Sequence, residues 1–181
     1  MYLKEVYMKN FKSFGKQTIV VKLSQGLTVV SGPNGSGKSN ISDALLFVVG
    51  GQRTKKLRAD NYAGLIFDGG KKGKGAKSAE VKLIFANDDR KINVDSDVVK
   101  FTKKIKQKGK GPTDVKTYYY INGRASSHGE FHNIFSAARL SSDGYNVVQQ
   151  GTVNDIADST PKQRRVILDD MAGITSLDEA L

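Results

Sequence analysis

Cysteine is absent from the sequence, which excludes disulfide bonds and metal sites built on thiolate ligands. Histidine is nearly absent too, since His128 and His132 are the two in the chain. Their spacing of four would place both on one helix face, where they could share a metal ion. A histidine pair without a carboxylate or cysteine on the same helix face is more often structural, so we expect no metal site there.

Long apolar runs are also missing. None approaches the roughly 20 residues needed to span a bilayer, and Met1–Phe11 lacks the uninterrupted apolar core of a signal peptide. We therefore expect a soluble, intracellular protein without a membrane partner. At 181 residues the chain suits one domain that buries its own hydrophobic core.

Acidic residues are few compared with basic ones: 18 Asp and Glu stand against 29 Lys and Arg, a formal net charge of +11. Such a field favours polyanionic partners, nucleic acid first and anionic membrane second. A soluble protein that is simply rich in lysine would show the same charge. Many of the lysines lie in two segments that we predict to be basic loops, either binding DNA phosphates non-specifically or merely solvated: Lys71, Lys72, Lys74 and Lys77, then Lys103, Lys104, Lys106, Lys108 and Lys110.

The spacing of apolar residues predicts several strands. Alternation around Val6 and Met8 indicates a half-buried strand with Ile19–Leu23 as its hairpin partner. The short apolar run Leu27–Val30 predicts a strand covered on both faces. Further strands are predicted at Val81–Phe85, Val98–Phe101 and Val115–Ile121, the last followed by the tight-turn pair Asn122-Gly123.

Three helices are predicted between and after these strands. Apolar residues at helical spacing follow residue 40 and stop at Gly50–Gly51. Ser127-x-x-Glu130 forms a capping box before a second helix. Thr160-Pro161-x-Gln163 begins a third. We read the whole as one compact α/β domain.

The glycine-rich segment between the apolar run and the first helix fits the Walker A pattern G-x-x-x-x-G-K-[ST]. Glycines let the backbone wrap a phosphate with its N–H groups pointing inward. Lys38 would reach the β- and γ-phosphates, Ser39 would supply a hydroxyl ligand to Mg²⁺, and the helix dipole would face the anion. The residues of this phosphate loop (P-loop) are Gly32, Pro33, Asn34, Gly35, Ser36, Gly37, Lys38 and Ser39.

A P-loop ATPase also needs an acidic residue at the end of an apolar strand, to hold Mg²⁺ and orient water. Asp169 and Asp170 follow an apolar run, but the Thr160-Pro161 cap indicates that this run is helical. Leu65–Asp68 is shorter and leads directly into the Gly/Lys segment. We reject both and expect the catalytic carboxylate on another polypeptide or on a part of the protein outside this sequence.

Motifs along the whole chain resemble those of the structural maintenance of chromosomes (SMC) proteins, most closely prokaryotic and archaeal ones. They are Asn10-Phe11-Lys12-Ser13-Phe14, the P-loop GPNGSGKSN, residues 43–51 (DALLFVVGG), Leu57-Arg58-Ala59, residues 119–124 (YYINGR), residues 142–148 (SDGYNVV), Gln150-Gly151 and residues 161–174.

The resemblance implies an α/β P-loop NTPase of the ABC-ATPase head type, with a mixed sheet around the P-loop helix and an antiparallel β subdomain. Residues 1–181 would be the N-terminal lobe only, ending where the coiled coil begins. The C-terminal lobe would carry the signature motif and Walker B. ATP and Mg²⁺ are the implied cofactors. The implied partners are that C-terminal lobe, a second head, a kleisin subunit and DNA bound non-specifically.

The resemblance also assigns roles to single residues. Gln150 matches the Q-loop glutamine that joins the Mg²⁺ shell and senses the γ-phosphate. Arg58 matches an arginine implicated in coupling DNA to ATP hydrolysis. Lys12 and Ser13 would lie near the nucleotide, as would Asn40, directly after the P-loop.

The function we expect is ATP binding and, with the C-terminal lobe, ATP hydrolysis that drives head engagement in chromosome condensation and segregation. The place of action would be the cytoplasm, on the nucleoid. Two alternatives stay open: the head of a related DNA-repair ATPase, and a nucleotide-regulated binding module without turnover.

Overall fold

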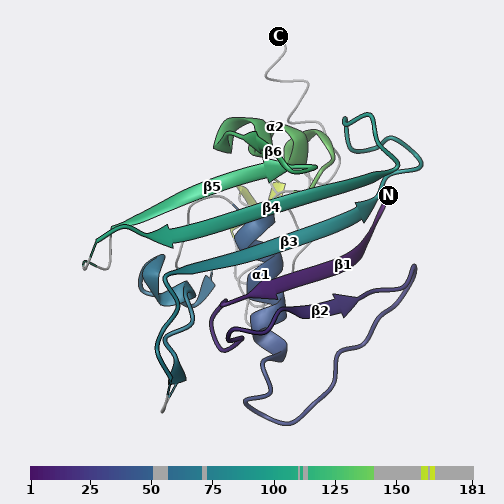
Figure 1. Ribbon diagram of the computed structural model, residues 1–181. Helices are drawn as coiled ribbons and strands as arrows, with labels where there is room; N and C mark the ends of the chain where they lie inside the picture. The colour runs from purple at the N-terminus through teal and green to yellow at the C-terminus, as the bar shows by residue number, and fades with distance from the viewer. Residues whose placement is uncertain are drawn as a thin grey trace.

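The described residues form one six-stranded sheet, seen face on in Figure 1. The computed structural model describes residues 1–50, 57–70, 73–109, 111, 114–140, 160–162 and 164–165. Its strands are β1 (Tyr2–Lys9), β2 (Ile19–Lys22), β3 (Ser78–Ala86), β4 (Val98–Gln107), β5 (Val115–Ile121) and β6 (Arg124–Ser126). They lie in the order β2-β1-β3-β4-β5-β6, and each neighbouring pair is antiparallel.

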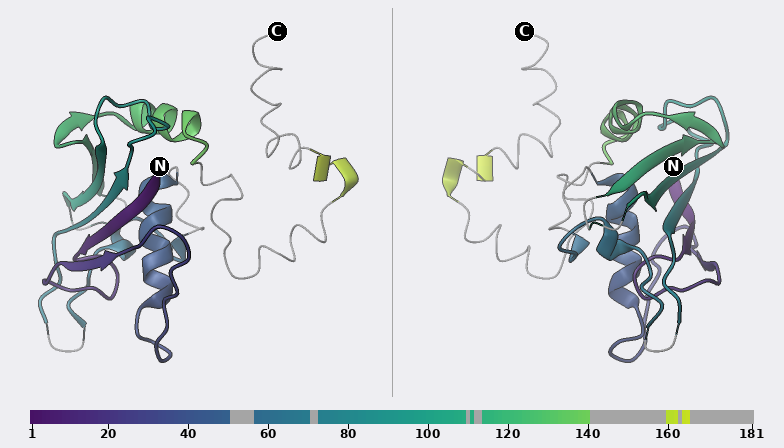
Figure 2. Two further views of the ribbon diagram at one scale, coloured as in Figure 1. Left: turned by 90° about the vertical axis from the view of Figure 1, so that its right-hand side faces the viewer. Right: turned by 60° about the vertical axis from the view of Figure 1, so that its left-hand side comes forward.

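One face of the sheet forms the hydrophobic core. Strand side chains point alternately to the two faces, and on β3 the buried members are Ala79, Val81, Leu83 and Phe85. Phe101 of β4 meets the rings of Phe131 and Phe135 at 5.4 and 4.5 Å between centroids. Helices α1 (Lys38–Val49) and α2 (His128–Ala137) both pack on this side, as the left view of Figure 2 shows.

Local signals predicted from the sequence are confirmed at both helices and at the β5–β6 turn. Helix α1 spans the predicted apolar positions and ends before Gly50, whose N–H donates to the Leu46 carbonyl. The Ser127 hydroxyl caps α2 by accepting from the Glu130 N–H at 3.1 Å. Asn122 and Gly123 have φ of 49° and 85°, the left-handed pair that a tight hairpin needs.

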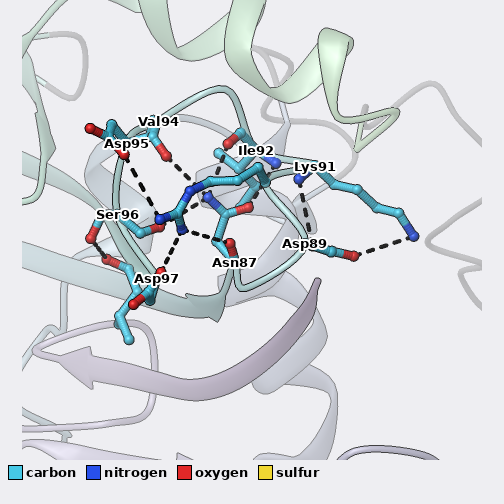
Figure 3. Close-up of polar contacts among 10 residues, drawn as sticks. Asn87, Asp89, Lys91, Ile92, Val94, Asp95, Ser96 and Asp97 are labelled. Atoms are coloured by element: carbon cyan, nitrogen blue, oxygen red, sulfur yellow. Dashed lines mark hydrogen bonds and ion pairs between the residues drawn. The ribbon is translucent and has the colours of Figure 1, made fainter.

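The connection between β3 and β4 is folded around one buried amide (Figure 3). The Asn87 Nδ2 donates to the carbonyls of Ile92, Val94 and Ser96, and its Oδ1 accepts from the Ile92 N–H. Because one side chain satisfies four backbone groups, it holds the eleven-residue connection, residues 87–97, in a single shape.

The prediction of a covered strand at Leu27–Val30 is wrong for this structure. These residues belong to no strand, and their side chains are exposed: Leu27 by 92%, Val29 by 77% and Val30 by 46%. An apolar run becomes a buried strand only where neighbouring strands pair with its edges and other elements cover its faces. No described element does so here.

The prediction of a basic loop at Lys103–Lys110 is also wrong over most of its length. Strand β4 continues to Gln107, and of the described residues only Lys108 and Gly109 follow it directly. Lys103 continues the buried series that includes Phe101 and Ile105, and is itself fully buried. Lys104 and Lys106 point to the opposite face. In the other predicted loop, Lys74 and Lys77 are exposed, as expected, and Lys71 and Lys72 lie outside the described residues.

The buried amine of Lys103 lies among aromatic rings. Its Nζ is 4.7 Å from the ring centre of Phe47, 5.7 Å from Tyr62 and 5.5 Å from Tyr119. Within the described part of the chain it has no hydrogen-bond acceptor. Burial lowers the pKa of Lys103 to about 8, because the charged amine has lost its water.

Candidate functional site

The P-loop lies on the surface at the start of α1. Residues 31–36 are exposed, and the helix begins at Lys38. Gly35 and Gly37 have φ of 81° and 93°, a conformation that glycine adopts without the steric cost of a side chain. A side-chain carbon on Gly37 would lie only 3.0 Å from the ring of Phe14. The loop is therefore both open to solvent and supported from behind by the Phe11–Phe14 segment.

Lys38 extends its ammonium back over the loop. Its Nζ donates to the carbonyls of Gly32 at 2.6 Å and Pro33 at 2.8 Å. These are exposed, neutral acceptors, so a phosphate group would be a stronger partner for the same cation. Helix α1 begins at Lys38 itself, and the N-terminus of a helix attracts anions because its first N–H groups have no carbonyl partner within the helix.

The segment Asn10–Phe14 turns sharply beside the start of α1. Asn10 and Lys12 have φ of 52° and 50°, and the Phe14 N–H donates to the Phe11 carbonyl at 2.9 Å. The turn brings Ser13 to Asn40, whose Nδ2 donates to the Ser13 hydroxyl at 2.7 Å. Non-glycine residues with positive φ are uncommon and concentrate at functional sites.

Asp43 joins two of the predicted site residues. Its carboxylate is 1% exposed and accepts from Lys12 Nζ at 2.5 Å and from the Arg58 guanidinium at 2.7 and 3.2 Å. Arg58 also donates to the Ser39 carbonyl at 2.6 Å, and Lys12 to the Leu57 carbonyl at 2.8 Å. One buried acid thus holds Lys12, Arg58 and the first turn of α1 together.

Asp43 is the residue that sequence reasoning missed as a member of the site. It appeared only as one letter of a helical motif. The available signal was its position four residues before Phe47 on the buried face of α1, because a buried carboxylate requires a cationic partner. The positive φ of Arg58, 49°, could not be predicted from the sequence either.

The remaining candidates are the predicted site residue Gln150 and the carboxylates that the sequence analysis rejected. Gln150, Asp169 and Asp170 lie outside the described residues. Asp68 stands after an isolated bridge at Ile66, and its carboxylate accepts from the Gly70 N–H at 2.9 Å. It therefore stabilises the turn that begins the Gly/Lys segment.

The two histidines face a small surface cavity at the end of α1. The His128 ring lies edge-on to Tyr119 at 5.7 Å, and His132 is 6.3 Å from His128. The cavity is otherwise lined by Val48, Val49, Gly50, Phe131 and Phe135. Among the described residues no group of three His, Cys, Asp or Glu side chains could hold a metal ion. No described helix is long and apolar enough to cross a membrane.

Comparison with known proteins gives consistent matches. The RecF/RecN/SMC N terminal domain matches residues 2–144. The Chromosome partition protein Smc of Pyrococcus furiosus is 40% identical over 177 residues, which are 98% of this chain and 14% of that protein. The chain thus spans a small part of the length of such curated relatives.

Solved structures agree with this. A structure from work on ATP-driven dimerization and DNA stimulated activation of SMC ATPases is 40% identical with a TM-score of 0.84, covering 94% of this chain and 99% of that one. The Smc head domain of Pyrococcus furiosus, solved with an extended coiled coil and bound to the C-terminal domain of ScpA, is 40% identical with a TM-score of 0.89. It covers 99% of this chain, and 44% of that chain is matched.

These likenesses confirm the predicted fold class, an α/β P-loop head of the ABC type, to which the antiparallel sheet described above belongs. The chain is a member of the SMC family and carries its RecF/RecN/SMC N terminal domain.

Proposed function

We propose that this chain binds ATP with Mg²⁺ and that, joined to a C-terminal lobe, it forms an ATPase head acting in chromosome condensation and segregation. The observation that carries the proposal is the exposed P-loop at the N-terminus of α1, with the Lys38 ammonium lying over it. Matches to chromosome partition proteins and to SMC heads studied for ATP-driven dimerization support it.

The residues of the P-loop fit a nucleotide phosphate. Lys38 would neutralise phosphate charge, and the loop N–H groups would bind phosphate oxygens. Bound Mg²⁺ would be held by the exposed Ser39 hydroxyl and by Gln150, and would offset charge on the phosphate oxygens. Asn40 and Ser13, which are bonded to each other, would border the nucleotide. Asp43 would keep Arg58 and Lys12 in place beside it.

A C-terminal lobe would complete both the sheet and the catalytic group. The exposed run Leu27–Val30 leads directly into the P-loop and has the composition of a strand buried on both faces. Strands from the second lobe would cover it. That lobe would also bring the catalytic carboxylate, because Asp68 stabilises a turn and the sequence predicts a helix, not a strand end, at Asp169.

The partners follow from the same comparison. Two heads would engage around ATP, a kleisin subunit would bind the head, and DNA would stimulate turnover. Related SMC heads are described with ScpA bound and with ATP-driven dimerization and DNA stimulated activation. The protein would work in the cytoplasm on the chromosome.

Steady-state ATP turnover tests the proposal. The chain alone should hydrolyse ATP negligibly, because positioned water and charge stabilisation are missing. Mixing or fusing it with its C-terminal lobe should restore turnover. If the chain alone reached the rate of the complete head, and Asp169→Asn abolished that rate, the carboxylate would reside in this chain and the two-lobe proposal would be wrong.

A further inference from the structure

The second face of the sheet is free of packing by any described helix. Both α1 and α2 lie against the buried face, so the face toward the viewer in Figure 1 is covered by no described element. We call the outward side chains of β3, β4 and β5 the outer sheet face. It carries five lysines and one glutamate on these strands: Lys82, Lys100, Lys104, Lys106 and Lys116, and Glu80.

Tyrosines are interleaved with these lysines. Tyr118 and Tyr120 stand on β5, and Tyr7 extends the face onto β1. Strand register pairs Lys104 with Tyr118 and Lys82 with Tyr7. Two ammonium groups lie over rings, Lys82 over Tyr7 and Lys116 over Tyr118, each at 5.3 Å. The rings of Tyr7 and Tyr118 thus contact a cation, and all three tyrosines stay partly exposed.

This combination is more specific than the excess charge of the whole chain. Lysines bind phosphates of any nucleic acid, but exposed aromatic rings add affinity by stacking on bases. Tyr118 and Tyr120 are two residues apart on one strand, about 6.8 Å, a spacing suited to neighbouring bases of an extended single strand. Bases of a duplex are already stacked on one another and would not reach the rings.

Ion pairs within the protein neutralise only part of the charge on the outer sheet face. Lys104 pairs with Glu80 at 3.5 Å, and both side chains stay more than one third exposed, so this pair is weak. Lys100, Lys106 and Lys116 are exposed. A phosphate approaching the face therefore meets a net positive surface.

We propose that the outer sheet face binds single-stranded DNA, with its lysines on the phosphates and the rings of Tyr118 and Tyr120 stacked on bases. The choice of DNA as the polymer rests on the proposed function; the single-strand preference rests on the tyrosines. The site lies on the side of the sheet opposite to α1, so it is separate from the P-loop.

The test uses the head formed by this chain with its C-terminal lobe, without nucleotide. Fluorescence anisotropy would measure binding of a labelled oligothymidine and of its duplex with oligoadenine over a salt series. One variant carries Lys82→Gln, Lys104→Gln and Lys116→Gln. A second carries Tyr118→Leu and Tyr120→Leu. A charge-matched control carries Lys74→Gln, Lys77→Gln and Lys108→Gln on the loops beside the sheet.

The lysine variant should bind the single strand at least about tenfold more weakly and lower the salt slope by roughly 2, from three lost phosphate contacts. The tyrosine variant should lose about tenfold on the single strand and less than about twofold on the duplex. The loop control should stay within about twofold of the unmodified head. Unchanged single-strand binding by either face variant would overturn the proposal, as would a loop control that loses as much as the lysine variant.

Separate measurements keep this outcome apart from that of the proposed function. Thermal unfolding shows whether each variant is folded, and ATP titration shows whether the P-loop is intact. Face variants that lose DNA but bind ATP normally would support the inference. A head that binds no ATP but still shows the predicted DNA losses would contradict the proposed function alone.

Discussion

Two apolar regions of the sequence differ in burial: one lies in the hydrophobic core and the other is exposed. On β1 and β3, Val6 and Leu83 are fully buried between the sheet and α1, whereas Leu27 and Val29 are 92% and 77% exposed. Burying a leucine or valine side chain stabilises the folded state by about 1.5–3 kcal/mol, and the second stretch gains little of this because its side chains stay largely exposed. The comparison separates two regions. The buried core stabilises the fold, whereas residues 27–39 are largely exposed and available to bind a ligand or another polypeptide. Substitutions should therefore change stability in the first region and binding in the second.

Asp43 lies where the two regions meet, and its removal should have the largest effect. Asp43→Ala leaves Arg58 and Lys12, whose side chain is 13% exposed, without their anion, so the free energy of unfolding should fall by about 3–5 kcal/mol. Chemical denaturation measures this. The double variant Asp43→Leu/Lys12→Met is the control, because replacing both charges by apolar groups should recover part of the loss. An Asp43→Ala protein of unchanged stability would show that the cluster is not structural.

Lys38 should show the reverse pattern. Lys38→Ala removes the cation over the P-loop, so ATP affinity should fall about 100-fold, or about 2.7 kcal/mol, with stability unchanged within about 0.5 kcal/mol. Isothermal titration with ATP and Mg²⁺ gives the affinity. Lys91→Ala, an exposed lysine in the β3–β4 connection, is the matched control and should bind normally. Equal ATP affinity in the two variants would remove Lys38 from the site.

Lys103 tests the buried region through pH. Its folded pKa of about 8 lies below the ordinary 10.5, so the folded state releases the proton first. Stability should therefore rise between pH 8 and about 10, by roughly 3 kcal/mol at most. Above that, Tyr62 acts in the opposite direction, because burial raises its pKa to about 12.

Lys103→Met keeps the length of the side chain and removes the amine. The variant should be about 1–3 kcal/mol more stable than the unmodified chain at pH 7, and the difference should shrink toward pH 10. Urea unfolding at several pH values measures both curves. Parallel curves for the two proteins would mean that the pKa of Lys103 is not lowered in the folded state.

Arg58 should affect regulation more than stability, because its side chain is half exposed and reaches from Asp43 to the Ser39 carbonyl. In the complete head we expect Arg58→Ala to lower DNA-stimulated ATP hydrolysis by about tenfold and basal hydrolysis by less. Rates with and without DNA decide this. A fall by the same factor in both would show that Arg58 serves the nucleotide site generally and not its coupling to DNA.

The smallest expected effect on stability is at Leu27. Leu27→Ser should change the free energy of unfolding of this chain by less than about 0.5 kcal/mol, since the side chain is already in water. The same substitution at the buried Leu83, Leu83→Ser, should lower the free energy of unfolding by several kcal/mol. Leu27→Ser should also weaken association with the C-terminal lobe, which size-exclusion chromatography measures. Undiminished association would show that the exposed run is not the contact with that lobe.

Features that depend on near neighbours could be predicted from the sequence. The P-loop needs glycines at fixed spacing and a lysine before a helix, the Ser127 cap needs a residue three positions on, and the Asn122-Gly123 turn needs two positive φ values. Each is set within a few residues by backbone sterics and local hydrogen bonds, so the residue types alone indicate it. The family resemblance extended the prediction to Lys12, Ser13, Arg58 and Gln150, whose roles at the nucleotide stay predictions; Gln150 lies outside the described residues.

Tertiary structure alone decided the features that depend on distant partners. A run such as Leu27–Val30 predicts a buried strand whether or not another strand is there to cover it. The lysines of β4 resemble a loop by composition, yet sheet register places Lys103 among Phe47, Tyr62 and Tyr119 and turns Lys104 and Lys106 to the opposite face. Asp43 joins Lys12 and Arg58, which are 31 and 15 residues away, because a buried charge must find its counter-ions wherever the fold brings them.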